Sequence, residues 1–168
     1  MTRQFFVSTI AIGLALAASA FASAQEPSGY KAVAGHYEAI RQALLNDSTE
    51  GAAAHAESIR QEAERLLQGF DAASASVPAE RSAECLEILP EIQNAAAWLA
   101  SAGTLDETRE VFGELSKAMV RYRQMLTNPD SVVVYCSMAE EVWIQPKGEI
   151  GNPYYGQSMA RCGEIVSR

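Results

Sequence analysis

Cysteine and histidine are scarce in this chain, and familiar catalytic motifs are missing. The 168 residues include three cysteines and two histidines. There is no His-Glu-x-x-His zinc motif, no Gly-x-Ser-x-Gly nucleophile motif and no Gly-rich phosphate loop. The many glutamates fall on predicted helix faces, where solvent is the usual neighbour. We therefore predict that the protein is not an enzyme.

Long apolar runs are also absent, except at the N-terminus. Arg3 is followed by an apolar run from Phe5 to Ala18, and Ala22-Ser23-Ala24 fits the small-x-small rule for signal peptidase. We predict a secretory signal peptide over residues 1–24, since the run is short for a membrane anchor. The chain is thus expected to be exported and soluble, with no membrane span after cleavage.

Acidic residues outnumber basic residues in this chain. The chain has 13 Lys and Arg against 21 Asp and Glu, which gives a net charge of −8. Phosphate backbones and anionic lipid headgroups repel such a chain. This composition excludes nucleic acid and membrane surfaces as main partners.

From residue 25 to residue 128 the apolar residues recur every three or four positions, which predicts amphipathic helices. The expected stripes run over 33–44, 52–70, 85–99 and 105–126. Short loops separate them, and this pattern is typical of an antiparallel up-and-down four-helix bundle. We therefore expect an all-α fold.

Local signals set the expected helix ends. Asp47 with Glu50, and Thr104 with Glu107, have the spacing of capping boxes that begin the second and fourth helices. Pro90 lies inside the third stripe, where it removes a backbone donor, so we expect a kink or a break there.

The character of the chain changes over residues 129–168. Val132–Tyr135 is β-branched and aromatic, which favours an extended segment. Pro146, Gly148 and Asn152-Pro153 mark a loop, and residues 157–165 are long enough for a short helix. We expect these pieces to pack on the bundle as part of one domain.

Two cysteines and two methionines occur in this tail as Cys-x-Met at residues 136–138 and as Met-x-x-Cys at residues 159–162. Residues two apart on an extended segment point the same way, so Cys136 and Met138 should share a side. Residues three apart on a helical turn are neighbours, so Met159 and Cys162 should do the same. If the loop folds back, four sulfurs meet. Thiolate and thioether ligands select soft ions such as Cu(I), and the pattern therefore predicts a soft-metal site.

A disulfide between Cys136 and Cys162 is the alternative. An exported chain meets oxidising conditions, in which such a bond persists. Closing this loop would stabilise the fold by roughly 3–4 kcal/mol in the chain-entropy model. One pair can be bridged when oxidised and bind metal when reduced, so the sequence leaves both readings open.

The tail resembles that of an exported bacterial domain family of unknown function. The resemblance is carried by Tyr135-Cys136-Ser137-Met138, Trp143-Ile144-Gln145, Asn152-Pro153-Tyr154-Tyr155-Gly156, Met159 and Cys162-Gly163. That family occurs alone or fused to periplasmic membrane-fusion-type adaptors of heavy-metal efflux pumps. The resemblance implies a periplasmic protein that binds copper or silver through Cys136, Met138, Met159 and Cys162. Ser137 departs from the family's usual proline.

The remaining candidate ligands are expected to be structural. We predict that Cys85 is a buried small hydrophobe and that Met119 fills the core. His36 and His55 are expected on different helices without a local partner, so no metal role is predicted for them. Trp143 should dock the tail on the bundle.

The resulting hypothesis is an exported Cu(I) or Ag(I) carrier or buffer that serves heavy-metal efflux, with an efflux adaptor or another pump component as its partner. One alternative is a disulfide-stapled helical module that binds a protein and no metal. The other is a structural envelope or stress protein.

Overall fold

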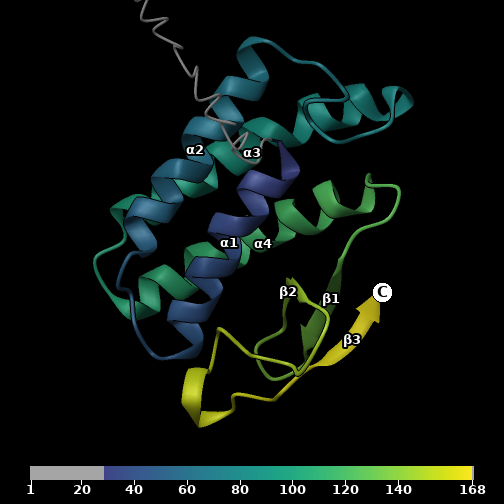
Figure 1. Ribbon diagram of the computed structural model, residues 1–168. Helices are drawn as coiled ribbons and strands as arrows, with labels where there is room; N and C mark the ends of the chain where they lie inside the picture. The colour runs from purple at the N-terminus through teal and green to yellow at the C-terminus, as the bar shows by residue number, and fades with distance from the viewer. Residues whose placement is uncertain (1–28, 168) are drawn as a thin grey trace, which may run out of the picture.

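A computed structural model describes residues 29–167 of the chain. The signal peptide predicted over residues 1–24 lies outside them. The described part is mostly helical and carries a small antiparallel sheet at one end (Figure 1). The expectation of an all-α fold is therefore only partly right.

Four helices form the larger part of the molecule. They are α1 (Tyr30–Leu45), α2 (Ala52–Gln68), α3 (Ser82–Ser101) and α4 (Leu105–Gln124), with a short 3-10 turn, η1 (Ala79–Arg81), before α3. Each helix contacts the next one along the chain, and α1 also contacts α4. This arrangement buries the apolar stripe of every helix.

Most of the predicted core residues are confirmed as buried, and those at some helix ends are partly buried. The inner positions of α3, including Cys85, are fully shielded from solvent, and so is Met119 of α4. Alanines occupy several inner positions of α2, for example Ala56 and Ala63, which lets neighbouring helices approach closely. Burial of these stripes, more than intrinsic propensity, stabilises the helices.

One of the two predicted helix caps is confirmed. Thr104 and Glu107 form a complete capping box at the start of α4. The prediction at Asp47 is wrong, because α2 begins only at Ala52 after Gly51, without a side-chain cap. Asp47 instead adopts a left-handed backbone conformation and bonds to other parts of the molecule.

Of the kink or break expected at Pro90, the break does not occur. The helix α3 continues through this residue from Ser82 to Ser101. Pro90 lies on the exposed side of the helix, whereas Leu89 and Ile92 beside it are buried. Packing of the buried side therefore outweighs the loss of one backbone hydrogen bond.

The tail forms three strands in the order β2-β1-β3, all antiparallel. They are β1 (Ser131–Cys136), β2 (Glu141–Pro146) and β3 (Glu164–Ser167). The extended segment predicted over Val132–Tyr135 is confirmed within β1. The predicted short helix over 157–165 is wrong: the chain makes only a 3-10 turn, η2 (Gly156–Ser158), and then enters β3.

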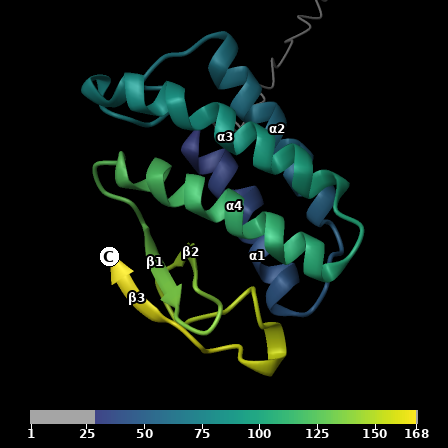
Figure 2. The same ribbon diagram turned by 180° about the vertical axis from the view of Figure 1, so that it is seen from behind.

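The sheet packs mainly on α4 through β2, so that α4 lies between α3 and the strands (Figure 2). Trp143 and Ile144 of β2 belong to the same hydrophobic core as the helices. Among residues 29–167, no helix is both long and apolar enough to cross a bilayer.

Candidate functional site

Cys136 and Cys162 meet at one end of the sheet. Cys136 is the last residue of β1 and is buried, whereas Cys162 is half-buried just before β3. Their Sγ atoms lie 2.9 Å apart, and no disulfide bond joins them in this structure. The antiparallel pairing of β1 with β3, which sets Tyr135 opposite Glu164, brings the two residues together.

A glycine allows this close approach. Gly163 follows Cys162 with a φ of 150°, which L side chains rarely adopt. A Cβ atom at this position would lie 2.8 Å from both the Trp143 ring and Val134 Cγ1. Residue 163 must therefore lack a side chain if Cys162 is to reach Cys136.

The two thiols have different electrostatic surroundings. Burial acts to raise the pKa of Cys136, but hydrogen bonds from Cys162, from the backbone N–H groups of Ala139 and Met138, and from the Asn152 side chain together lower it. The pKa of Cys162 is raised, first by its hydrogen bond to Cys136 and then by burial. Cys136 is therefore the more acidic thiol of the pair.

Asn152 fixes the backbone around the site, and the sequence analysis missed this role. Its side-chain nitrogen donates to the Cys162 carbonyl at 2.9 Å. Its side-chain oxygen accepts from the backbone N–H groups of Tyr154 and Tyr155 at 2.8 and 3.2 Å. Asn before Pro is a signal for such a turn, but nothing local indicated that the turn would hold a cysteine.

The two methionines lie on the turns that flank the cysteines. Met138 follows β1 in the turn that leads to β2, and 63% of it is exposed. Met159 is half-buried after η2, and its carbonyl accepts from the Cys162 N–H at 3.0 Å. The expected pairing of Met138 on a strand face and of Met159 on a helical face is therefore wrong, although both residues stay close to the cysteines along the chain.

Polar anchors hold the site against the helices. Arg109 of α4 donates to the Pro153 carbonyl at 3.0 Å and to Asp47 Oδ1 at 2.6 Å. The other oxygen of Asp47 accepts from the Gln157 N–H at 3.1 Å. Arg41 of α1 donates to the Gly151 carbonyl at 2.6 Å. These bonds connect the loop before Cys162 to α1 and α4.

Aromatic side chains complete the support. Trp143 is fully buried and its ring N–H donates to Gln145 at 2.9 Å. Tyr154 packs edge-on against Trp143 and donates to the Val142 carbonyl at 2.7 Å. The docking role predicted for Trp143 agrees with this position in the shared core.

Cys85 lies in the hydrophobic core on α3 and not in the tail. It is fully buried on α3, where burial raises its pKa to about 11. Such a thiol stays protonated and inert at neutral pH. The prediction that it is a small core hydrophobe is confirmed.

His36 and His55, expected to lack a partner, instead face each other. His36 lies on α1 and His55 on α2, with their Nδ1 atoms 3.1 Å apart. Burial first, and then the neighbouring His55, lower the pKa of His36, while Glu62 opposes the shift. Sequence reasoning missed the pair because the register between two helices is not encoded by either helix alone.

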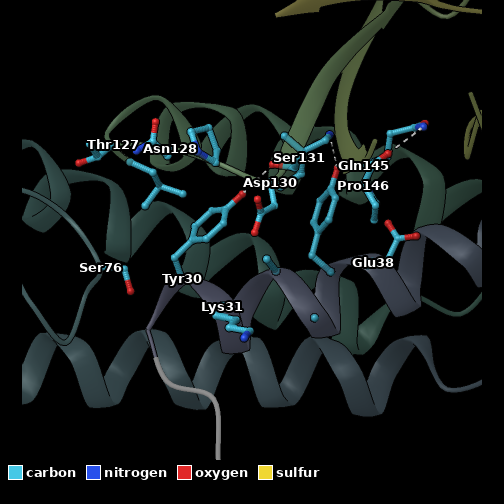
Figure 3. A pocket seen from close by; sticks show the side chains of 16 residues that line it. Tyr30, Lys31, Glu38, Ser76, Thr127, Asn128, Asp130, Ser131, Gln145 and Pro146 are labelled. Atoms are coloured by element: carbon cyan, nitrogen blue, oxygen red, sulfur yellow. Dashed lines mark hydrogen bonds between the residues drawn. The ribbon is translucent and has the colours of Figure 1, made fainter. Parts of the chain in front are cut away.

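A cleft of about 690 Å³ opens elsewhere, between the start of α1 and the loop that joins α4 to β1 (Figure 3). Tyr30, Lys31 and Glu38 line it from α1, and Gln145 and Pro146 from β2. None of the four sulfur residues predicted to bind metal lines this cleft. Within residues 29–167, no three His, Cys, Asp or Glu side chains converge as metal ligands, so a metal site here needs methionine or solvent as further ligands.

Comparison with known proteins gives one match. A family model described as "Protein of unknown function (DUF3347)" matches residues 33–130, which cover all but the first three residues of the helical part and stop just before β1. No curated protein and no solved structure matches the chain. The match carries no activity, and it does not extend to the sulfur residues of the tail.

Proposed function

Since this chain belongs to DUF3347, a family of unknown function, we propose its function from its own residues: it binds Cu(I), and Ag(I) by the same chemistry, at Cys136 and Cys162. The observation that carries the proposal is the 2.9 Å separation of the two sulfurs, and the lowered pKa of Cys136 supports it. Soft thiolate ligands favour Cu(I) over oxygen-seeking cations. Met138 and Met159 are proposed as additional thioether ligands.

Metal binding requires a small rearrangement. With a metal–sulfur bond of about 2.3 Å, as for zinc thiolates, the two sulfurs must separate by roughly 1 Å to hold an ion between them. Cys162 is half-buried at the end of a turn, and rotation of its side chain is the movement that we propose. Met138 is 63% exposed and can close over the ion from the solvent side.

The cellular role follows from the expected export signal and the family resemblance. We propose that the protein acts in the periplasm as a carrier or buffer that delivers the ion to an efflux adaptor. Its net charge of −8 is consistent with cation capture, although most of that charge is spread over a solvated surface. Cell fractionation tests the location, and the copper tolerance of a strain lacking the gene tests the role.

Titration of the reduced chain with Cu(I) against a competing chelator tests the site itself. We expect one tightly bound ion per chain. The double variant Cys136→Ser, Cys162→Ser should lose it, whereas Cys85→Ala should keep it because Cys85 is buried in the helical core. Equal Cu(I) uptake by the double variant and the unsubstituted chain would disprove the site.

A matched pair of variants tests the thioethers. Met138→Leu and Met159→Leu keep the apolar volume and remove only the sulfur. Each should bind Cu(I) more weakly than the unsubstituted chain. If both bind as tightly as the parent, the site consists of the two thiols alone.

The disulfide-stapled interaction module remains the second candidate, because the same 2.9 Å separation suits bond formation. Alkylation under denaturing conditions, followed by mass spectrometry, counts free thiols in the exported chain purified without reductant. Three modified cysteines support the metal carrier. A single modified cysteine in a chain that also fails to bind Cu(I) after reduction supports the module.

A further inference from the structure

The paired histidines suggest a site that is independent of the sulfur residues. His36 and His55 come from α1 and α2, and their ring centres lie 5.3 Å apart with the planes tilted by 40°. Both side chains are half-buried, so solvent reaches the pair from one side. The family match over residues 33–130 includes both residues but assigns no role to them.

The two helices hold the pair in a fixed register. Seven residues before His36, the Gly29 N–H donates to Glu62 Oε1 at 2.7 Å, and Glu62 lies seven residues after His55. The antiparallel register that brings Gly29 to Glu62 therefore also brings His36 to His55. Beside the histidines, Val33 and Ile59 are fully buried, which keeps the backbones in place. Sites on packed helices are held more rigidly than sites on loops.

The separation of the nitrogens suits cis ligands of one ion. With metal–nitrogen bonds of 2.0–2.1 Å, the 3.1 Å between the Nδ1 atoms corresponds to an angle of about 98° at the metal. That value lies between the tetrahedral and tetragonal angles. Without a metal, one ring must donate its proton to the other at this distance. An ion that replaces this proton lies beside the line joining the two nitrogens, and the rings must tilt toward it for both lone pairs to bind.

The nearby charge and the ligand type narrow the choice of ion. Imidazole suits Zn, Cu and Ni ions, and affinity among divalent ions peaks at Cu(II). Glu62 is the carboxylate that acts on His36, and its charge is partly offset by the ion pair that it forms with Arg65 at 2.6 Å. Water supplies the remaining ligands on the exposed side.

We propose that His36 and His55 form an interhelical site for a divalent transition-metal ion, with Cu(II) bound more tightly than Zn(II) or Ni(II). The site goes beyond the proposed function and does not depend on it, because it uses nitrogen ligands and the oxidised form of copper. The sulfur residues of the tail would bind Cu(I) instead.

Electron paramagnetic resonance of Cu(II) tests the proposal on the exported chain carrying Cys136→Ser and Cys162→Ser, which keeps thiols of the tail from reducing the ion. We expect one Cu(II) per chain and a spectrum split by two equivalent nitrogens. Loss of a group that only hydrogen-bonds to a metal ligand costs about 10–100-fold in metal affinity. Replacement of either ligand by His36→Ala or His55→Ala should therefore cost at least as much.

Two controls make the result decisive. Gln61→Ala changes an exposed residue of α2 and should leave Cu(II) binding unchanged. Circular dichroism checks that each alanine variant folds. If one does not, His36→Gln or His55→Gln, which keeps a polar side chain, is used in its place. Cu(II) binding that survives removal of both histidines, or a spectrum without nitrogen splitting, would overturn the proposal. The Cu(I) titration reports on the sulfur site separately, since the histidine variants retain all cysteines when made in the parent chain.

Discussion

At the scale of single residues, the candidate site depends on side chains that bind no metal themselves. Asn152 is fully buried and ties the Cys162 carbonyl to the turn before it. The Asn-Pro pair was recognised as a turn signal, but its connection to Cys162 depends on residues ten positions apart coming together. A local pattern could not predict this.

Asn152→Ala should destabilise the fold and weaken Cu(I) binding. The substitution leaves the Tyr154 N–H and the Cys162 carbonyl without their partner, which costs about 1–3 kcal/mol for buried groups. Urea denaturation measures the loss of stability. Gln42→Ala, at an exposed position of α1, is the control and should have little effect. Equal stability of Asn152→Ala and the parent would contradict the role given to this residue.

Substitution by alanine should change the stability of the protein in opposite directions at Gly156 and at Gly35. Gly156 has a φ of 52°, and a Cβ there would collide with Asp47 and Arg109. Gly156→Ala should therefore destabilise the chain by more than about 1 kcal/mol. Gly35 lies within α1 with no atom near its missing Cβ, so Gly35→Ala should stabilise it by about 0.5–1 kcal/mol. Thermal unfolding of both variants checks the prediction, and a shift of the same sign in both would refute it.

At the scale of secondary structure, the helices could be predicted and most of the sheet could not. A helix can be recognised from its own periodic sequence, and most positions of the α2 and α4 stripes coincide with buried residues. A strand needs a partner that lies far along the chain. β3 has only four residues and pairs with β1 across a long loop, so the local pattern favoured a helix there. The sequence correctly predicts that Cys136 and Cys162 meet, but the helical turn expected around Cys162 does not form.

Pro90 gives a prediction at this scale. It lies on the exposed side of a continuous α3, where it supplies no donor to the Leu86 carbonyl one turn earlier. Pro90→Ala should restore that hydrogen bond and stabilise the protein, by up to about 3 kcal/mol. Urea denaturation compares it with Glu87→Ala, an exposed neighbour expected to be nearly neutral. A loss of stability in Pro90→Ala would mean that the ring itself supports the packing of α3.

At the scale of the whole molecule, the connection between tail and helices contains an acid-sensitive contact. The Arg109 side chain and then the Gln157 N–H lower the pKa of Asp47 below its ordinary value of 3.8. The folded state thus favours the carboxylate. The stabilising contribution is complete above the unfolded value and is lost as the pH falls through the lower, folded pKa.

Asp47→Asn should remove this dependence while keeping the local backbone, since Asn tolerates the left-handed conformation at residue 47. We expect the urea midpoint of the parent to fall more steeply between pH 5 and pH 2 than that of Asp47→Asn. Hydrogen exchange at the Gln157 amide should rise over the same range in the parent. Parallel pH curves for the two proteins would show that Asp47 does not link the tail to the helices.

The order of the two cysteines along the chain affects when the site can exist. Synthesis proceeds from the N-terminus, so Cys136 leaves the ribosome 26 residues ahead of Cys162. A chain that ends between these residues carries Cys136 without Cys162, and it lacks the strand β3 that brings the two together. The proposed Cu(I) site therefore cannot form until β3 is in place, and a chain that ends before Cys162 should bind no Cu(I) there.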